Sequence, residues 1–526
     1  MGERFTILAN HPRGILSREE RDAGQSVLSD LQIDRAMRTV CPEYTLRDAF
    51  LSVLLTPLTD PEEIVERQRI LRLFFETPEL LDRLTEALRR VLMTKNSWDA
   101  ERSRLMASRR VNPQDKSLVL WVARENLVLT AHFTRIILTG LRDFHETLNM
   151  FGAAGGWLDR LKQNVSNIAF APEVEDLLAY TDKIEKGLPQ AHAYTAEFEC
   201  SPELRANIPF LVDFDFIPLS KKPDKPQRSG LFALFSKSSK GDAKEIAQAP
   251  KEAGLPEHHV PLEGTDVEWG LDTAARAVQE SDRLLTSFLR GVVDRFTGLE
   301  EELYFYQCAV LYLNRFRDRA VRFVYPEILG ESENTLSFAD LSDFLLLTES
   351  MYVQSVIPND VSYSKAEGGV SGMLVTGKNN SGKTVYLRSI GTAVLLAQCG
   401  LPVPAREAQI SVRRRIFTTF ARAEGELIPQ SSAGRFEEEV AEIAEVIREM
   451  EPNSLLLLNE TFQTTAYDEG AEGIMPILAY LSSLGCGFIF VTHLTRLIEQ
   501  YKKEPGVTVV KTSDDPRTRY RISVVG

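Results

Sequence analysis

Two glycines, a lysine and a threonine stand at the spacing G-x-x-x-x-G-K-[ST], from Gly377 to Thr384. Gly377 and Gly382 allow backbone N–H groups to curl around phosphate oxygens, because glycine adopts backbone conformations that other residues avoid. Lys383 can then reach the β and γ phosphates, and the Thr384 hydroxyl can bind Mg²⁺. The residues between the two glycines, which would wrap the phosphates, are Lys378, Asn379, Asn380 and Ser381. The spacing therefore predicts a site for a nucleoside triphosphate and Mg²⁺.

The segments on either side of this loop have the pattern that such a site requires. An apolar run over residues 373–376 predicts a buried strand before the loop, and residues 385–398 have the periodicity of a helix after it. The alternative is a tight turn with a lysine that faces solvent. That alternative does not account for the order of strand, loop and helix.

Two further apolar runs end in residues suited to the hydrolysis of a phosphate bond. Residues 455–458 are all leucine and are followed by Asn459 and Glu460, where nucleotide-hydrolysing domains place a metal ligand and an acid that activates water. We therefore predict that Glu460 is the general base. Residues 488–492 lead to His493, whose imidazole could polarise the γ-phosphate and the attacking water at the same edge of the sheet. A capping or surface role is the alternative for His493.

The composition is that of an ordinary soluble chain with room for several domains. The 526 residues are 43% hydrophobic and 26% charged, and no apolar run approaches the about 20 residues of a membrane span. The net charge of −14 argues against a protein that coats nucleic acid over its whole surface. The N-terminus lacks a signal-peptide pattern, and the five cysteines include no C-x-x-C pair. We therefore expect a cytoplasmic protein with reduced thiols and no membrane contact.

Periodicity separates a helical part of the chain from an α/β part. Apolar residues recur at intervals of three and four from about 44 to 188 and again from 269 to 324, which predicts two sets of helices. Between them, residues 205–217 alternate in polarity, which favours short strands, and residues 218–268 have little periodicity. From about residue 371, strands and helices alternate. This order is typical of a nucleotide-binding domain with its phosphate chemistry at the carboxyl ends of the strands.

These residues and their surroundings resemble the MutS family of DNA mismatch-repair ATPases. The resemblance is carried by a phosphate loop with a following Tyr-Leu-Arg at 376–388, two further landmarks at 400–405 and 415–418, a Val-Thr-His run at 491–493, the segment 357–361 before the nucleotide strand, and the start of a helical core at 55–60 and 66–68. The similarity is good over about 355–500 and moderate over 44–95. It is weak between these two regions.

The resemblance implies a multidomain α and α/β chain, in which a helical lever or core with a possible clamp precedes an ABC-type P-loop ATPase domain. It divides the sequence into an N-terminal segment (1–43), a helical core or lever (44–204), a clamp-like or flexible basic insertion (205–268), returning lever helices (269–340) and a MutS-type ATPase domain (341–526). It also implies a homodimer in which the partner's signature loop completes each ATP site. The adenine of ATP would pack at Ile357.

Two positions depart from the family's pattern. Most MutS proteins have an aspartate where this chain has Asn459, so we expect a looser Mg²⁺ site and slow turnover. If the helix that begins at Phe436 is aligned with its counterpart, the family's signature Ser-Thr falls on residues 434–435. Either the serines at 431–432 take that place or Arg435 supplies the charge to the partner's site, and both alternatives stay open.

The similarity begins near residue 44, and the chain ends soon after the ATPase region. We therefore expect neither the family's mismatch-reading domain nor a C-terminal nuclease domain. The resulting interpretation is an ATP-dependent DNA-binding protein of repair or recombination, whose dimer opens or closes a clamp on duplex or branched DNA. One alternative is a nucleotide-gated scaffold that does not hydrolyse ATP and binds an unidentified protein partner. Another is an ABC-type ATPase that acts on RNA or ribosomes.

Local charge indicates where DNA would bind. Residues 221–244 hold seven Lys or Arg against two Asp, and flexible basic chain can bind phosphates by releasing counterions. A solvated linker is the alternative for this segment. A second candidate for DNA contact is the arginine-rich helix that holds Arg102, Arg104, Arg109 and Arg110.

Overall fold

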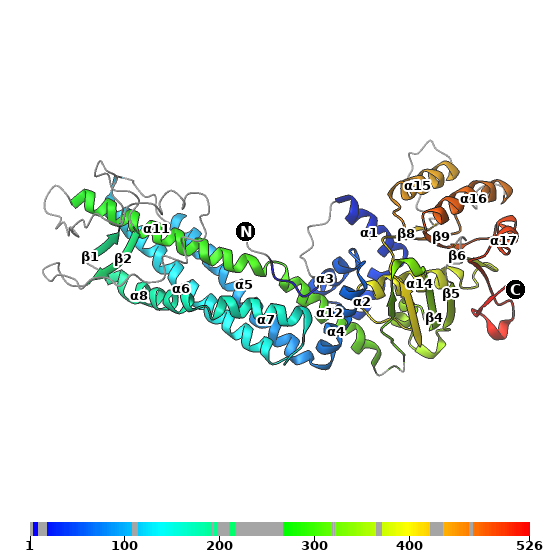
Figure 1. Ribbon diagram of the computed structural model, residues 1–526, viewed down its shortest axis with the longest axis horizontal. Coiled ribbons are helices and arrows are strands. Elements are labelled where there is room, and N and C mark those ends of the chain that lie inside the picture. The colour runs from blue at the N-terminus through cyan, green and yellow to red at the C-terminus, as the bar shows by residue number, and fades with distance from the viewer. Residues whose placement is uncertain are drawn as a thin grey trace. The chain divides into compact units, whose positions relative to one another are not determined.

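The computed structural model describes residues 4–8, 18–107, 114–190, 193–197, 210–215, 267–317, 319, 321–363, 371–420, 435–461 and 467–525. They form two compact units, and Figure 1 labels many of their elements. Unit 1 comprises Met1–Thr6 and Glu79–Glu300, and unit 2 comprises Ile7–Pro78 and Glu301–Gly526. The basic segment 221–244 and the signature positions 431–434 lie outside the described residues.

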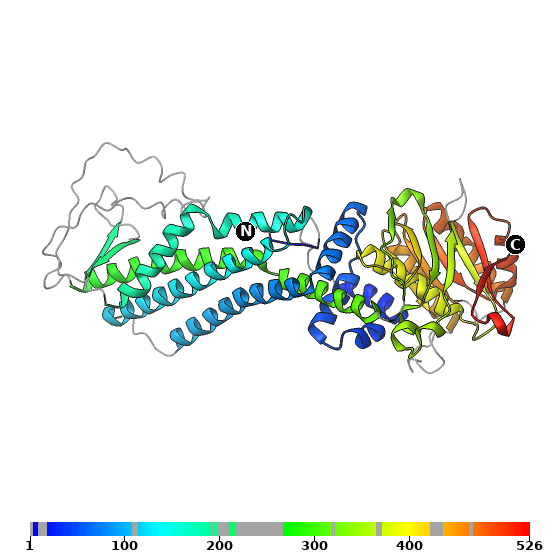
Figure 2. The same ribbon diagram turned by 90° about the horizontal axis from the view of Figure 1, so that it is seen from below.

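Unit 1 is built mainly from long helices. Its helical elements are α5 (Pro78–Ala107), α6 (Lys116–Asn149), α7 (Gly156–Ala169), α8 (Pro172–Gly187), η1 (Leu188–Gln190), α11 (Val267–Val293) and η3 (Asp294–Phe296). Helices α6 and α11 pack along each other, and Figures 1 and 2 show them side by side. An antiparallel pair of short strands, β1 (Ala193–Glu197) and β2 (Phe210–Asp215), follows η1. Strand β2 lies inside the segment whose alternating polarity predicts strands.

A partly buried ion pair joins three helices of unit 1. Arg102 on α5 donates to both carboxylate oxygens of Asp282 on α11, at 3.0 and 2.6 Å. The hydroxyl of Thr130 on α6 accepts from the same guanidinium and donates to the same carboxylate. Arg102 is therefore engaged inside unit 1, and its role as a candidate DNA contact stays a prediction. Residues 109–110 of the same arginine-rich segment lie outside the described residues.

Unit 2 combines helices with two sheets. Within the described ranges, its α-helices are α1 (Arg18–Asp30), α2 (Ile33–Val40), α3 (Tyr44–Leu54), α4 (Pro61–Glu76), α12 (Leu299–Arg317), α13 (Phe344–Glu349), α14 (Lys383–Gln398), α15 (Arg435–Glu449), α16 (Tyr467–Ser483) and α17 (Thr495–Tyr501). Its short 3-10 helices are η4 (Glu331–Glu333), η5 (Val353–Ser355) and η6 (Pro516–Thr518). The strand orders are β12-β11-β6-β10-β9-β8 in the larger sheet and β3-β7-β4-β5 in the smaller one.

The larger sheet contains the three buried strands that the apolar runs predict. Its strands, in spatial order, are β12 (Ile522–Val524), β11 (Val507–Thr512), β6 (Ser371–Thr376), β10 (Gly487–Val491), β9 (Leu455–Asn459) and β8 (Ile416–Phe420). Strands β6, β9 and β10 are buried along nearly their whole length. The smaller sheet consists of β3 (Glu327–Leu329), β7 (Glu407–Ser411), β4 (Leu336–Leu341) and β5 (Asn359–Tyr363).

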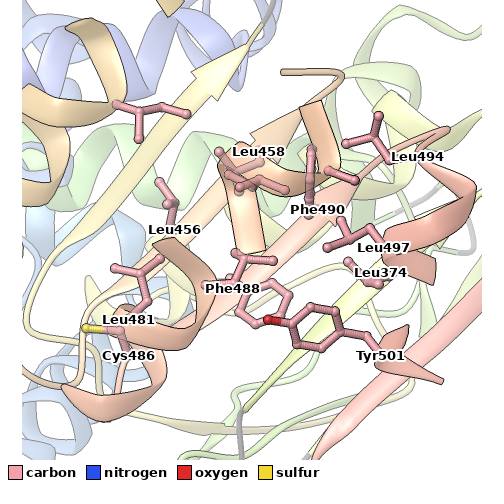
Figure 3. Close-up of a cluster of buried hydrophobic side chains, with 14 of the residues drawn as sticks. Leu374, Leu456, Leu458, Leu481, Cys486, Phe488, Phe490, Leu494, Leu497 and Tyr501 are labelled. Atoms are coloured by element: carbon pink, nitrogen blue, oxygen red, sulfur yellow. The ribbon is translucent and has the colours of Figure 1, made fainter. Parts of the chain in front are cut away.

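Alternate side chains of the central strands face opposite layers of helices. Leu458 of β9 belongs to a buried cluster with residues of α16 and α17, in which the rings of Phe488 and Tyr501 pack edge to face (Figure 3). Its neighbour Leu457 faces α14 instead, because a Cβ added to Gly391 of that helix would lie 2.5 Å from the Leu457 side chain. Helices therefore cover both faces of the central strands, as is usual for parallel strands.

Helix α14, which follows the phosphate loop, is anchored at its middle and at its end. Arg388 donates to both carboxylate oxygens of Asp343 at 2.9 Å, and both side chains are buried. The Gln398 amide donates to the carbonyl oxygens of Leu58 and Arg413, in both cases at 2.8 Å. These buried hydrogen bonds fix the helix that presents the phosphate-binding lysine.

The architecture confirms the predicted fold class. A helical N-terminal region is followed by α/β structure, and a strand, a loop and a helix occur in that order around residues 377–382. No described helix has both the length and the apolar character that crossing a bilayer requires. The domain boundaries drawn from the sequence stay a prediction. The compact units describe a different division, since Ile7–Pro78 packs with Glu301–Gly526.

Candidate nucleotide-binding site

The phosphate loop connects Thr376 at the end of β6 with Lys383 at the start of α14. Three of its residues have left-handed backbone conformations, Gly377 with φ 142°, Asn380 with φ 58° and Gly382 with φ 95°. These angles explain the two glycines, because a β-carbon is disfavoured in such conformations. The loop thus brings its own N–H groups together with the positive end of α14. That combination suits a phosphate group.

The amine of Lys383 lies within this loop. Its Nζ donates to the carbonyl oxygens of Gly377 at 3.1 Å and Lys378 at 2.9 Å. It also lies 3.6 Å from the Glu460 carboxylate, and only 4% of the Lys383 side chain is exposed. Burial lowers the pKa of Lys383, and the Glu460 carboxylate opposes that shift. Phosphate oxygens could replace the carbonyls as stronger, charged partners of this amine.

Thr384 and Asn459 provide two neutral oxygen atoms beside the loop. The Thr384 hydroxyl donates to Asn459 Oδ1 at 3.1 Å. Mg²⁺ prefers oxygen ligands, and in nucleotide sites it takes several of them from phosphates and water. The described residues include no group of three or more His, Cys, Asp or Glu side chains that could hold a metal. The oxygen pair therefore fits a Mg²⁺ ion that arrives with a nucleotide better than one held by protein ligands alone.

Glu460 and His493 meet at one edge of the sheet because β9 and β10 pair in parallel, with Asn459 opposite Val491. The Glu460 N–H donates to the Val491 carbonyl at 2.9 Å. Glu460 has a left-handed φ of 58°, a conformation that costs free energy in a residue with a β-carbon and often occurs at functional sites. Its Oε1 atom lies 3.6 Å from both Lys383 Nζ and His493 Nε2.

The His493 ring has the properties of a neutral imidazole. Its Nε2 is buried and has no hydrogen-bond partner in the described part of the chain, since 3.6 Å to Glu460 is too long for a hydrogen bond. Burial lowers the pKa of His493, the charge of Lys383 lowers it further, and Glu460 opposes both effects. A neutral ring nitrogen without a partner can bond to a water molecule or a phosphate oxygen.

Ile357, the residue predicted to contact adenine, is partly buried just before β5. Two residues later, the Asn359 amide donates to the carbonyl of Tyr520 at 3.1 Å. The Tyr520 ring lies beside the phosphate loop, 3.2 Å from the position of a Cβ added to Gly382. The segment that holds Ile357 is therefore linked to the loop through the C-terminal part of the chain.

The structure brings the predicted catalytic and metal-binding side chains into one site, and they are Lys383, Thr384, Asn459, Glu460 and His493. The loop residues Lys378, Asn379 and Asn380 are exposed, and Ser381 is partly buried. The sequence motifs miss Thr512 and Asp514, which contact Ser381 and Lys378. No spacing marks these two residues, because their position depends on how β11 pairs with β6.

Parallel central strands with a phosphate loop and these side chains at one edge define a P-loop nucleotide-binding domain. Residues 373–521 match the family model of MutS domain V. This part of the chain is therefore the ATPase domain of the MutS family.

The chain is similar to DNA mismatch repair proteins of several organisms. It is 33% identical over 154 residues to MutS of Caldicellulosiruptor bescii, which covers 29% of this chain and 17% of that protein. It is 30% identical over 154 residues to MSH2 of Saccharomyces cerevisiae, which covers 29% of this chain and 16% of that protein. A longer match to MutS of Petrotoga mobilis, 23% identical over 465 residues, covers 84% of this chain and 52% of that protein. The chain thus spans about half the length of this last relative and less of the other two.

Substitutions at Lys383 and Glu460 separate nucleotide binding from hydrolysis. We expect Lys383→Ala to abolish ATP binding, because it removes the buried cation of the loop. Glu460→Gln should keep ATP bound and slow phosphate release by about 10²- to 10⁴-fold, because it removes only the proton acceptor. Calorimetric titration and a phosphate-release assay measure the two effects. Equal ATP affinity in the wild type and Lys383→Ala would refute the site.

The controls for this pair make the same chemical changes at residues that do not belong to the site. Lys502 and Glu499 form an ion pair of 3.0 Å on the surface of unit 2. Lys502→Ala and Glu499→Gln should therefore bind and hydrolyse ATP as the wild type does. A similar loss in the controls would mean that the change in net charge, and not the site, causes the effect.

Asn459→Asp should lower the Mg²⁺ concentration needed for ATP binding. The carboxylate would replace a neutral amide oxygen that already contacts Thr384, and Mg²⁺ binds carboxylates more tightly. Titration of ATP affinity against Mg²⁺ measures the shift, with Asn149→Asp on the surface of α6 as a control for the added charge. An unchanged Mg²⁺ requirement would mean that residue 459 does not face the metal.

Proposed function

We propose that this chain is a MutS-like ATPase that forms a homodimer and couples ATP binding and hydrolysis to the opening and closing of a helical clamp on duplex or branched DNA. The observation that carries the proposal is the position of the Glu460 carboxylate. Its Oε1 lies 3.6 Å from both Lys383 Nζ and His493 Nε2, in a domain of the MutS family. The action on DNA, in repair or recombination, is supported by the relatives, which are DNA mismatch repair proteins.

Each residue of the site would have its own part in the reaction. Lys383 would bind the β and γ phosphates, and Thr384 and Asn459 would hold Mg²⁺. The ion would neutralise phosphate charge that develops during transfer. Glu460 would accept the proton of the attacking water, and the neutral His493 would orient that water or the γ-phosphate through Nε2. The left-handed turn at Glu460 supports this role, because it brings the carboxylate beside both neighbours.

The long helices of unit 1 would form the lever and the clamp. Helices α5, α6 and α11 have 30, 34 and 27 residues. Their lengths are therefore about 45, 50 and 40 Å. The Arg102–Asp282 ion pair ties α5 to α11, so these helices would move together. A rigid group of helices is what a lever requires.

A second candidate function is a nucleotide-gated scaffold that binds a protein partner without hydrolysing ATP. The neutral Asn459 at the metal position favours it, because the Thr384–Asn459 pair contains no carboxylate. ATP binding without any measurable phosphate release by the wild type, with or without DNA, would support the scaffold over the clamp.

We also propose a cytoplasmic location. Among the described residues, the buried cysteines Cys41, Cys308 and Cys486 form no disulfide bond. Reduced thiols are what the cytoplasm maintains.

ATP with Mg²⁺ should promote or close a homodimer. In the proposed arrangement, the helix that begins near Phe436 of one copy completes the ATP site of the other, so ATP adds contacts between the two copies. Sedimentation of the Glu460→Gln variant with and without ATP measures the change, and Lys383→Ala should not respond. A monomer at micromolar concentrations that ignores nucleotide and has full ATPase activity would contradict the dimer.

DNA should stimulate phosphate release, and its binding should weaken steeply with salt. The test variant neutralises four cations together, and they are Lys221, Lys222, Lys225 and Arg228. In this variant, the slope of log affinity against log salt concentration should become less steep by roughly 0.9 for each lost phosphate contact. Base sequence should matter little, because phosphate contacts do not read bases. Duplex, mismatched, forked and four-way DNA serve as ligands in both assays.

The control removes four exposed cations from unit 2, and they are Arg414, Arg496, Lys502 and Lys503. It lowers the net charge by the same amount and should leave the salt dependence unchanged. If the variant neutralised at residues 221–228 binds DNA with an unchanged slope, DNA contacts other residues of the chain.

A further inference from the structure

Strand β11 lies against the phosphate loop because of its register with β6. The two strands are parallel, with Lys511 opposite Thr376, so the next residues, Thr512 and Gly377, are also neighbours. A Cβ added to Gly377 would lie 1.8 Å from Thr512 Oγ1. Thr512 is 1% exposed. Its side chain therefore fills the space that the first glycine of the loop leaves free.

A chain of hydrogen bonds leads from Thr512 to the phosphate-binding lysine. Thr512 Oγ1 donates to Ser381 Oγ at 2.8 Å, and Ser381 Oγ donates to the Lys378 carbonyl at 2.6 Å. The same carbonyl accepts from Lys383 Nζ at 2.9 Å. The buried threonine of β11 thus fixes a loop hydroxyl and, through it, the backbone around the amine of Lys383.

An ion pair adds a second link between the loop and the residues after β11. Asp514 lies 3.3 Å from Lys378 Nζ and 2.6 Å from Lys511 Nζ. The two lysines lower the pKa of Asp514, so the carboxylate stays charged at neutral pH. Because these side chains are exposed, the ion pair contributes little by itself. The buried hydroxyl of Thr512 is the stronger of the two links.

The segment that carries these links is itself held in place. The Ser513 N–H donates to the Arg521 carbonyl at 2.8 Å, which closes the connection between β11 and β12. Asn359 Oδ1 accepts from the Ile522 N–H at 2.8 Å, and its amide donates to the Tyr520 carbonyl at 3.1 Å. The connection is therefore fixed to β5, which allows it to act as a support for the phosphate loop.

We propose that Thr512, supported by Asp514, is a positioning residue of the nucleotide site: it holds the phosphate loop in the shape that binds phosphates by bonding Ser381. This inference rests on the proposed binding of ATP by residues 377–384. Thr512 and Asp514 lie outside the sequence motifs of the site. The shape of the phosphate loop would thus depend on β11 and on the residues that follow it.

The test compares Thr512→Val with Thr508→Val. Both substitutions replace a hydroxyl by a methyl group on β11, but the Thr508 hydroxyl donates to the Ser362 carbonyl and not to the loop. We expect Thr512→Val to weaken binding of both ATP and inorganic tripolyphosphate by about two- to tenfold, the effect of one hydrogen bond. Thr508→Val should bind both ligands as the wild type does, and Thr512→Ser should restore binding because it keeps the hydroxyl. Titration calorimetry measures all affinities.

A double-mutant comparison distinguishes positioning from general loss of stability. Ser381→Ala should weaken binding as much as Thr512→Val, and the double variant should be no weaker than either one, because both break the same chain of hydrogen bonds. Additive losses would overturn the proposal, and so would unchanged affinity in Thr512→Val. If Thr512→Val does not fold, the other two variants test the positioning role. Weaker ATP binding by Ser381→Ala with unchanged binding by Thr512→Ser would support it, and unchanged binding by Ser381→Ala would contradict it.

The wild type and Lys383→Ala separate the positioning role of Thr512 from ATP binding itself. If the wild type binds ATP and Lys383→Ala does not, while Thr512→Val is unchanged, only the positioning role is wrong. If the wild type binds neither ATP nor tripolyphosphate, the proposed function itself is wrong.

Discussion

The nucleotide site depends on the parallel register of three central strands. Val375 of β6, Val491 of β10 and Asn459 of β9 stand level with one another in the sheet. Because the strands run in the same direction, the phosphate loop, the general base and the imidazole emerge at one edge. A slip of β9 by one residue would turn its side chains to the opposite face and separate Glu460 from Lys383.

The charges at this edge follow from the same arrangement. Lys383 is buried, and its ammonium is tolerated because Glu460 and two loop carbonyls surround it. The amide of Asn459 adds no negative charge beside the loop. A nucleotide would therefore meet less repulsion here than at a site with two carboxylates, and its metal would be held less tightly. ATP binding and ATP hydrolysis are thus expected to depend on different residues.

The sequence predicts the centre of the domain better than its edges. The runs that become β6, β9 and β10 are mostly apolar, and the glycines mark the loop between β6 and α14, so local patterns are sufficient there. The strands of the smaller sheet and β11 are partly exposed. Their pairing joins segments far apart in the chain, such as β4 with β7. Only that pairing brings Thr512 next to Ser381. The Arg102–Asp282 pair is missed for the same reason, because the two residues are 180 positions apart.

The most direct test of the site is a crystal structure of the Glu460→Gln variant with ATP and Mg²⁺. We expect Lys383 to leave the carbonyls of Gly377 and Lys378 and to bond to phosphate oxygens, with the metal at the side chains of Thr384 and Asn459. A nucleotide bound elsewhere, or a Lys383 amine that keeps its two carbonyl partners while the phosphates lie outside the loop, would contradict the assignment of this edge of the sheet as an ATP site.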